Sequence, residues 1–122
     1  MHKTSINQAP SPLISPAGEI LIELIGRQAE NGGTSQQSLA YVIIPPHKSS
    51  AAHYHKVMEE TYYILRGTAR MIIDDKEFTL QTGQACLIQP HEKHQIFSEH
   101  EENMEFLAIC TPAWYPQDSY AV

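Results

Sequence analysis

Short apolar runs alternate with turn signals along most of this chain. Runs rich in apolar, β-branched or aromatic residues occupy 20–25, 39–44, 61–65, 68–73, 77–80, 85–88, 95–98 and 104–110. Glycine, proline or charged residues end these runs roughly every ten residues, a spacing typical of an all-β sandwich or barrel. No window of eleven or more residues carries a 3.6-residue apolar period. The pattern therefore predicts an all-β fold without a long helix.

The two ends of the chain differ from the part between them. Three prolines lie within residues 1–18 and predict an extended arm rather than a helix. Residues 19–110 are expected to form one β-barrel, with a turn at Asn31-Gly32-Gly33. Residues 111–122 form a second arm that contains Trp114. We expect this arm to pack over the barrel or a partner subunit, or to cover a pocket as an aromatic lid.

Composition narrows the class of protein. The 122 residues carry 14 acidic against 8 basic side chains, a net charge of −6, which argues against nucleic acid or a membrane surface as partner. Two cysteines, Cys86 and Cys110, do not make a disulfide framework and are expected to be buried thiols. The first apolar run, 20–25, lacks a basic lead-in and is too short to span a bilayer, so we expect a cytoplasmic protein. That run would leave an apolar edge strand exposed in a monomer, which favours a homodimer.

Histidine is the residue that points to chemistry. In His53-Tyr54-His55 the two imidazoles lie on one face of a strand, about 7 Å apart at Cα, and can hold one metal ion. A carboxylate from Glu60 reaches the same face only if the chain turns or bulges through 56–58. His94 offers a fourth ligand. A polar cluster without a metal ion is the alternative, although four ionisable groups in an apolar barrel are costly without a cation.

Two segments resemble the motifs of a known family. HYHKVMEETYYILRG, residues 53–67, resembles the first motif of the cupins, in which His-x-His is followed by Glu and then Gly. GQACLIQPHEKHQIFS, residues 83–98, resembles their second motif, in which Gly leads through an apolar strand to Pro and His. The resemblance implies a small jelly-roll β-barrel. It also implies one divalent transition-metal ion per chain (Fe, Mn, Ni, Cu or Zn) with the ligands His53, His55, Glu60 and His94.

Three positions depart from the family pattern, and two residues are catalytic candidates. His47 and His91 stand where the motifs carry glycine, and Ser98 stands where the second motif carries asparagine. The lost glycines put the local turn geometry in doubt. Tyr62 shares strand parity with Glu60 and is a candidate to bind substrate, or else packs in the core. His91 is a candidate proton carrier at the barrel mouth, and Ser98 is a candidate ligand contact.

The resemblance implies several functions. The first expectation is a metal-dependent enzyme that acts on a small organic molecule as a dioxygenase-like oxidoreductase. Isomerase, epimerase or lyase chemistry at the same metal ion is the first alternative. A non-catalytic cupin that binds a small ligand is the second, because one scaffold hosts many functions.

Overall fold

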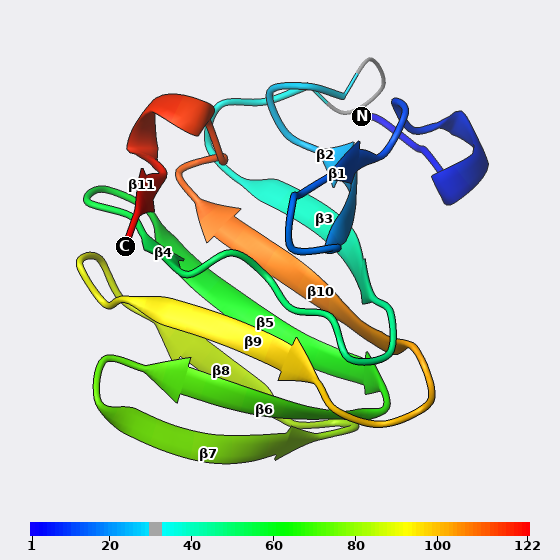
Figure 1. The fold of residues 1–122 in the computed structure, drawn as a ribbon. Coiled ribbons are helices and arrows are strands. Elements are labelled where there is room, and N and C mark those ends of the chain that lie inside the picture. The colour runs from blue at the N-terminus through cyan, green and yellow to red at the C-terminus, as the bar shows by residue number, and fades with distance from the viewer. Residues whose placement is uncertain (30–32) are drawn as a thin grey trace.

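Two antiparallel sheets form the body of the molecule, as the computed structural model in Figure 1 shows; it describes residues 1–29 and 33–122. The six-stranded sheet has the order β1 (Leu13–Ile14), β2 (Ile20–Ile25), β3 (Ser38–Ile44), β10 (Met104–Thr111), β5 (Glu59–Arg66) and β8 (Ala85–Ile88). The five-stranded sheet has the order β11 (Tyr120–Ala121), β4 (His53–Tyr54), β9 (His94–Ser98), β6 (Thr68–Ile73) and β7 (Lys76–Gln81). The predicted jelly-roll fold is confirmed.

The strands form because their apolar side chains recur at every second position. Along β10, buried and half-buried residues alternate from Met104 to Cys110, and β6 alternates in the same way from Thr68 to Ile73. Side chains two apart on a strand share a face, so each sheet turns one apolar face inward. The core lies between these faces, and Phe106, Met71 and Ile64 are fully buried in it.

The observed strands agree with the predicted ones over most of the chain. Strands β2, β6 and β8 have the predicted bounds, whereas β5 begins two residues earlier, at Glu59. Strands β1 and β11 were not predicted, and each lies in a segment expected to be an arm. A strand of two residues is too short to show an alternating pattern, and it forms only by pairing with a neighbouring strand. The Asn31-Gly32 part of the predicted turn lies outside the described residues.

Helical structure is limited to two single turns of 3-10 helix, Ile6–Gln8 and Pro116–Asp118, within the described residues. The first of them lies in the predicted extended arm, just before its prolines, where the proline restriction does not reach. In the described part of the chain, no helix is long and apolar enough to cross a membrane.

The edge of the larger sheet differs from the expected one. Strand β1 pairs with β2, with Leu13 opposite Leu21 and Ile14 opposite Ile20. Strand β1 therefore covers only the first two residues of β2, and the edge on which the expectation of a homodimer rested is covered in part. Strand β1 itself is only two residues long, and short edge strands are one way in which proteins limit edge-to-edge pairing. The homodimer stays a prediction.

The turns at His47 and His91 form although histidine replaces the two motif glycines there. His47 and His91 adopt left-handed backbone conformations, with φ of 62° and 73°. Glycine is favoured at such angles because a Cβ atom is strained there, although histidine is among the residues that tolerate them. The backbone N–H of His91 donates to the carbonyl of His55 at 2.6 Å, which joins this turn to the strand end that carries the histidine pair.

Candidate metal centre

Four side chains from three strands meet at one point inside the barrel. His53 lies on β4 and His55 directly follows it, Glu60 lies near the start of β5, and His94 begins β9. One ligand atom from each of the four lies within 4.8 Å of the other three. The pairing of His53 with His94 across β4 and β9 places those two rings 4.3 Å apart between centroids. The four residues predicted from the sequence are therefore brought together.

All three imidazole rings are held in the same tautomer. Each Nδ1 atom lies within hydrogen-bond distance of a backbone carbonyl: those of Ala51 (2.7 Å), Asp118 (2.8 Å) and Glu92 (3.0 Å) for His53, His55 and His94. A carbonyl oxygen only accepts, so each Nδ1 must carry a proton. In the neutral rings Nε2 is then an unprotonated acceptor. This second contact of a ring is how proteins orient histidine ligands toward a metal ion.

Three buried atoms at the centre lack hydrogen-bond partners. They are Nε2 of His55, Nε2 of His94 and Oε1 of Glu60. Both nitrogens face that one oxygen, at 3.5 Å from His55 and 3.2 Å from His94. Acceptors that face each other in a buried site require a cation between them, either a proton or a metal ion. The residues present thus fit a divalent ion with nitrogen and oxygen ligands.

The ionisable groups at the centre shift one another's pKa values. Burial opposes ionisation of Glu60, but its contacts with His55 and His94 outweigh burial and hold the pKa of its carboxyl well below the usual range. Burial, followed by the charge of His94, lowers the pKa of His53 to about 4. Burial alone would lower the pKa of His55, yet the contact with the negatively charged Glu60 carboxylate raises it above its ordinary value. The contacts of Glu60 with these histidines therefore favour a negatively charged carboxylate at the centre.

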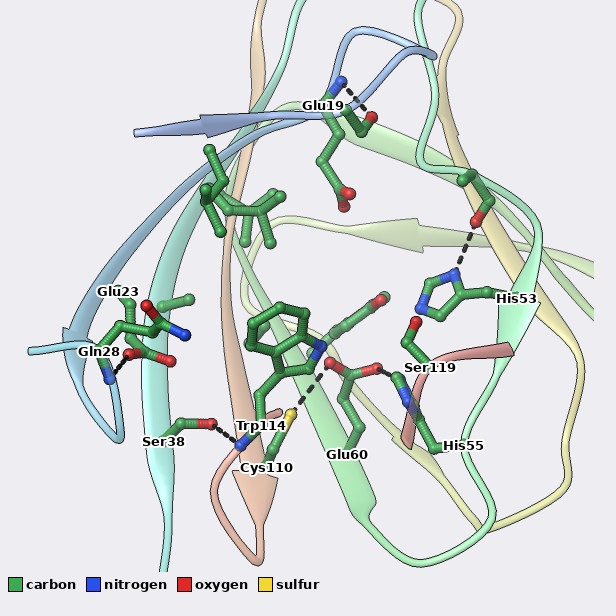
Figure 2. A pocket seen from close by; sticks show the side chains of 18 of the residues that line it. Glu19, Glu23, Gln28, Ser38, His53, His55, Glu60, Cys110, Trp114 and Ser119 are labelled. Atoms are coloured by element: carbon green, nitrogen blue, oxygen red, sulfur yellow. Dashed lines mark hydrogen bonds and ion pairs between the residues drawn. The ribbon is translucent and has the colours of Figure 1, made fainter. Parts of the chain in front are cut away.

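A cavity of about 400 Å³ opens beside these four residues. Its wall comes from the inner face of the six-stranded sheet and from both ends of the chain (Figure 2). Pro10 to Ser15 contribute from the N-terminal side, and Trp114 and Ser119 from the C-terminal side. His53, His55 and Glu60 are part of the wall, so a molecule in the cavity would touch the candidate centre. This volume is typical of sites for small organic molecules.

Comparison with known proteins agrees with the geometry. Residues 40–110 match the family model described as "Cupin domain". The chain belongs to the cupin family. An uncharacterized protein of Methanocaldococcus jannaschii is 31% identical to this cupin over 108 residues, which are 88% of this chain and 85% of that protein.

Solved structures share the fold at lower identity. The nucleoside dehydratase Pac13 of Streptomyces superposes with a TM-score of 0.79 at 12% identity, over 100% of this chain and 91% of that chain. A predicted oxalate decarboxylase of Thermotoga maritima superposes with a TM-score of 0.74 at 22% identity, over 90% of this chain and 98% of that one. At such identities the likeness establishes the barrel and not the reaction.

Asp118 supports the centre from the C-terminal segment of this cupin. Its carboxylate accepts hydrogen bonds from the backbone N–H groups of Lys56, Val57 and Met58, at 2.9 to 3.2 Å. These residues are the turn that the sequence required between His55 and Glu60. The carboxylate fixes the turn because it satisfies three N–H groups that face one point. Sequence reasoning missed Asp118; the only signal was that such a turn needs an acceptor from elsewhere.

Cys110 contacts a candidate ligand directly. Its thiol donates to Oε2 of Glu60 at 3.2 Å, and the two residues are direct cross-strand partners on β10 and β5. Burial, then the charge of Glu60, raises the pKa of this thiol, so it stays protonated as a donor. Both cysteines are free; Cys110 is buried as predicted, and Cys86 is half-buried against the core. The sequence indicated a buried thiol at Cys110 but not its partner.

Of the three remaining candidates, Tyr62 lies on the cavity wall, whereas His91 and Ser98 do not. Tyr62 is buried on the cavity wall, with its ring centroid 6.2 Å from that of His94, so it is positioned to meet a bound molecule. The His91 side chain is exposed and is not among the residues of this wall; only its backbone supports the site. Ser98 also lies elsewhere, where its hydroxyl donates to the carbonyl of Glu102. Glu59, the neighbour of Glu60 on β5, is exposed.

The position of Trp114 bears on whether the C-terminal arm packs on its own barrel or on a partner subunit. This residue lies on the cavity wall of its own chain, and its backbone N–H donates to the Ser38 hydroxyl at 3.0 Å. Figure 2 shows the indole among the side chains that line the cavity. Trp114 therefore contacts the cavity of its own chain, and the packing of this arm on a partner subunit stays a prediction.

Proposed function

We propose that this cupin binds one divalent transition-metal ion through His53, His55, Glu60 and His94 and is an enzyme that acts on a small organic molecule in the adjoining cavity. The observation that carries the proposal is the convergence of three partnerless buried acceptors at the cavity wall. Three imidazoles and one carboxylate suit Fe, Mn, Ni, Cu or Zn. A bound ion would supply Lewis-acid polarisation of a substrate oxygen.

Proton transfer within the substrate is the chemistry that the cavity favours. Glu19 lines the same cavity and is 8% exposed. Burial, then the charge of Glu60, raises the pKa of the Glu19 carboxyl to about 7. Such a carboxyl gains and loses a proton near neutral pH, as a general acid or base must. The hydroxyl of Tyr62, whose pKa burial raises well above 10, is available as a neutral hydrogen-bond donor.

We therefore favour a lyase or isomerase reaction, in which a proton moves and no external oxidant is consumed. The names of two similar structures, a nucleoside dehydratase and a predicted oxalate decarboxylase, are compatible with lyase chemistry. The dioxygenase-like activity implied by the resemblance stays a prediction that oxygen uptake tests.

The test is turnover of a panel of small hydroxylated and carbonyl compounds by metal-loaded protein, in air and under argon. The proposal expects a product whose formation continues without oxygen, stops on chelation and falls by about 10²- to 10⁴-fold in Glu19→Gln. Glu59→Gln makes the same charge change on an exposed residue and should keep wild-type turnover. Turnover that requires oxygen would restore the dioxygenase alternative. Compounds that stabilise the protein but are recovered unchanged would favour a binding protein.

A further inference from the structure

The cavity is lined by acidic residues and by no lysine or arginine among the described residues. Besides two histidines, three glutamates line it: Glu19, Glu23 and Glu60. Arg27, which follows β2, is committed elsewhere: its guanidinium donates to backbone carbonyls of Ala113 and Ser35, at 3.1 and 3.3 Å. Away from the metal centre, a ligand in this cavity meets carboxyl groups and no lysine or arginine that would neutralise a negative charge of the ligand, among the residues that the structure describes.

Glu19 is placed in the cavity by a defined turn. The N–H of Gly18 donates to the carbonyl of Ser15 at 3.0 Å, which closes a β-turn with Pro16 at its second position. Gly18 has φ of 105°, and a Cβ atom there would come within 2.9 Å of Lys48, so this turn requires glycine. The backbone N–H of Glu19 then donates to the Ser15 hydroxyl at 3.2 Å. The turn fixes the backbone of Glu19, and its side chain points into the cavity (Figure 2).

The three carboxyl groups differ in what remains free to bind a ligand. Oε2 of Glu23 accepts the backbone N–H of Gln28 at 2.7 Å, and Oε2 of Glu60 accepts the thiol of Cys110. The carboxyl of Glu19 takes part in none of the hydrogen bonds found among the described residues. A buried carboxyl without a partner is costly, and a hydroxyl group of a ligand would satisfy it.

The rest of the wall is apolar and includes aromatic rings. Trp114, Tyr62 and Phe106 line the cavity together with Leu21. Aromatic faces and a carboxyl group are complementary to a molecule with C–H faces and hydroxyl groups. A divalent ion beside the Glu60 carboxylate would retain a single net positive charge, enough to attract one oxygen of such a molecule but not a second anionic group at its other end.

We propose that the cavity binds an uncharged, hydroxyl-bearing molecule of the size of a free sugar, and that Glu19 hydrogen-bonds one of its hydroxyls and discriminates against anions such as sugar phosphates and dicarboxylates. This inference rests on the proposed function, since it names the class of molecule on which the metal centre acts. Above about pH 7, where the Glu19 carboxyl is ionised, an anionic group beside Glu19 and Glu23 in this cavity is repelled, because like charges placed together cost several kcal/mol.

Matched pairs of probes test the proposal. Ribose against ribose 5-phosphate, glucose against glucose 6-phosphate, and glucose against glucuronate differ in charge but keep the sugar ring. Binding to the metal-bearing protein is measured at pH 8, where Glu19 is ionised, by calorimetry and by saturation-transfer NMR. At least one free sugar should bind about tenfold or more tightly than its own anionic derivative. The Glu19→Gln variant should reduce that ratio several-fold, whereas Glu59→Gln, with the same charge change outside the cavity, should leave it unchanged.

Several results would overturn this inference. An anionic derivative that binds as tightly as its parent sugar would do so, as would metal-bearing protein that binds none of the free sugars. An unchanged ratio in a Glu19→Gln protein that unfolds like the wild type would remove Glu19 from the account. Failure of the proposed function is recognised separately, because it would appear as absence of bound metal or of turnover and not as a preference among probes.

Discussion

The backbone carbonyl of Asp118 accepts a hydrogen bond from Nδ1 of His55 at 2.8 Å, although the two residues are 63 positions apart. The Asp118 side chain meanwhile holds the turn that leads from His55 to Glu60. One residue near the C-terminus thus orients a candidate ligand and sets the path of the chain to the next one. The metal centre depends on a segment outside the two sequence motifs.

Replacing Asp118 with alanine should weaken both the fold and the metal site. Three backbone N–H groups would lose their acceptor, at a cost of about 1–3 kcal/mol in unfolding free energy. The affinity for zinc, measured by competition with a chromophoric chelator, should fall by about 10- to 100-fold because the turn between His55 and Glu60 is no longer fixed. Asp75→Ala, in the exposed β6–β7 turn, is the control. Zinc affinity equal to that of the wild type would contradict the positioning role of Asp118.

Cys110 should tune the metal site through Glu60. In Cys110→Ala the Oε2 atom of Glu60 loses its donor, so zinc affinity should fall several-fold while the fold persists. In Cys110→Ser a hydroxyl replaces the thiol as donor, and affinity should return toward that of the wild type. If alanine and serine weaken binding equally, the volume of the sulfur atom matters and its hydrogen bond does not.

Glu19 should make the metal-free protein less stable as the pH rises. The folded chain keeps the Glu19 proton up to about pH 7, whereas the unfolded chain loses it near 4.5. The folded state therefore binds more protons between these values, so stability falls as the pH rises through this window. The loss is complete above about pH 7 and amounts to at most about 3 kcal/mol.

Chelated wild type and Glu19→Gln are compared by urea unfolding from pH 4.5 to 8. The unfolding free energy of the variant minus that of the wild type should rise with pH, since glutamine has no proton to lose. Glu59→Gln should show no such rise. A pH-independent difference for Glu19→Gln would mean that this carboxyl titrates at an ordinary pKa.

His91→Gly should stabilise the protein slightly. The left-handed conformation of His91, with φ of 73°, is strained for a residue with a Cβ atom, and glycine would relieve about 0.5–1 kcal/mol after the entropy of the unfolded chain is counted. His100→Gly, at a position without positive φ, should destabilise instead. The stabilities of the two variants are compared by their denaturant midpoints. A loss of stability in both would show that the turn does not strain His91.

The sequence predicted what depends on local pattern. Period-two alternation identified the longer strands, and strand parity placed His53 and His55 on one face. The full set of candidate ligands, with Glu60 and His94, came from the resemblance to the two cupin motifs, and the structure brings these four residues together. The need for a turn at 56–58 followed from the same parity.

The remainder depends on contacts between distant segments. Asp118 and Glu19 carry no motif, and their roles follow from where the C-terminal and N-terminal segments return to the barrel. The contact of Cys110 with Glu60 follows from the register of β10 against β5, which alternation alone does not set. Strands β1 and β11 are two residues each, and only their partners define them.

The central claim is that four side chains hold one metal ion, and its most direct test is the metal content of the protein. Protein purified without an affinity tag or added metal is analysed by plasma mass spectrometry, beside His53→Ala/His94→Ala and the matched control His47→Ala/His100→Ala. We expect close to one iron, manganese, nickel, copper or zinc ion per chain in the wild type and the control, and a loss of that ion in the His53→Ala/His94→Ala variant. Wild-type protein that takes up no metal even after loading, or a His53/His94 variant that keeps its metal, would contradict the account.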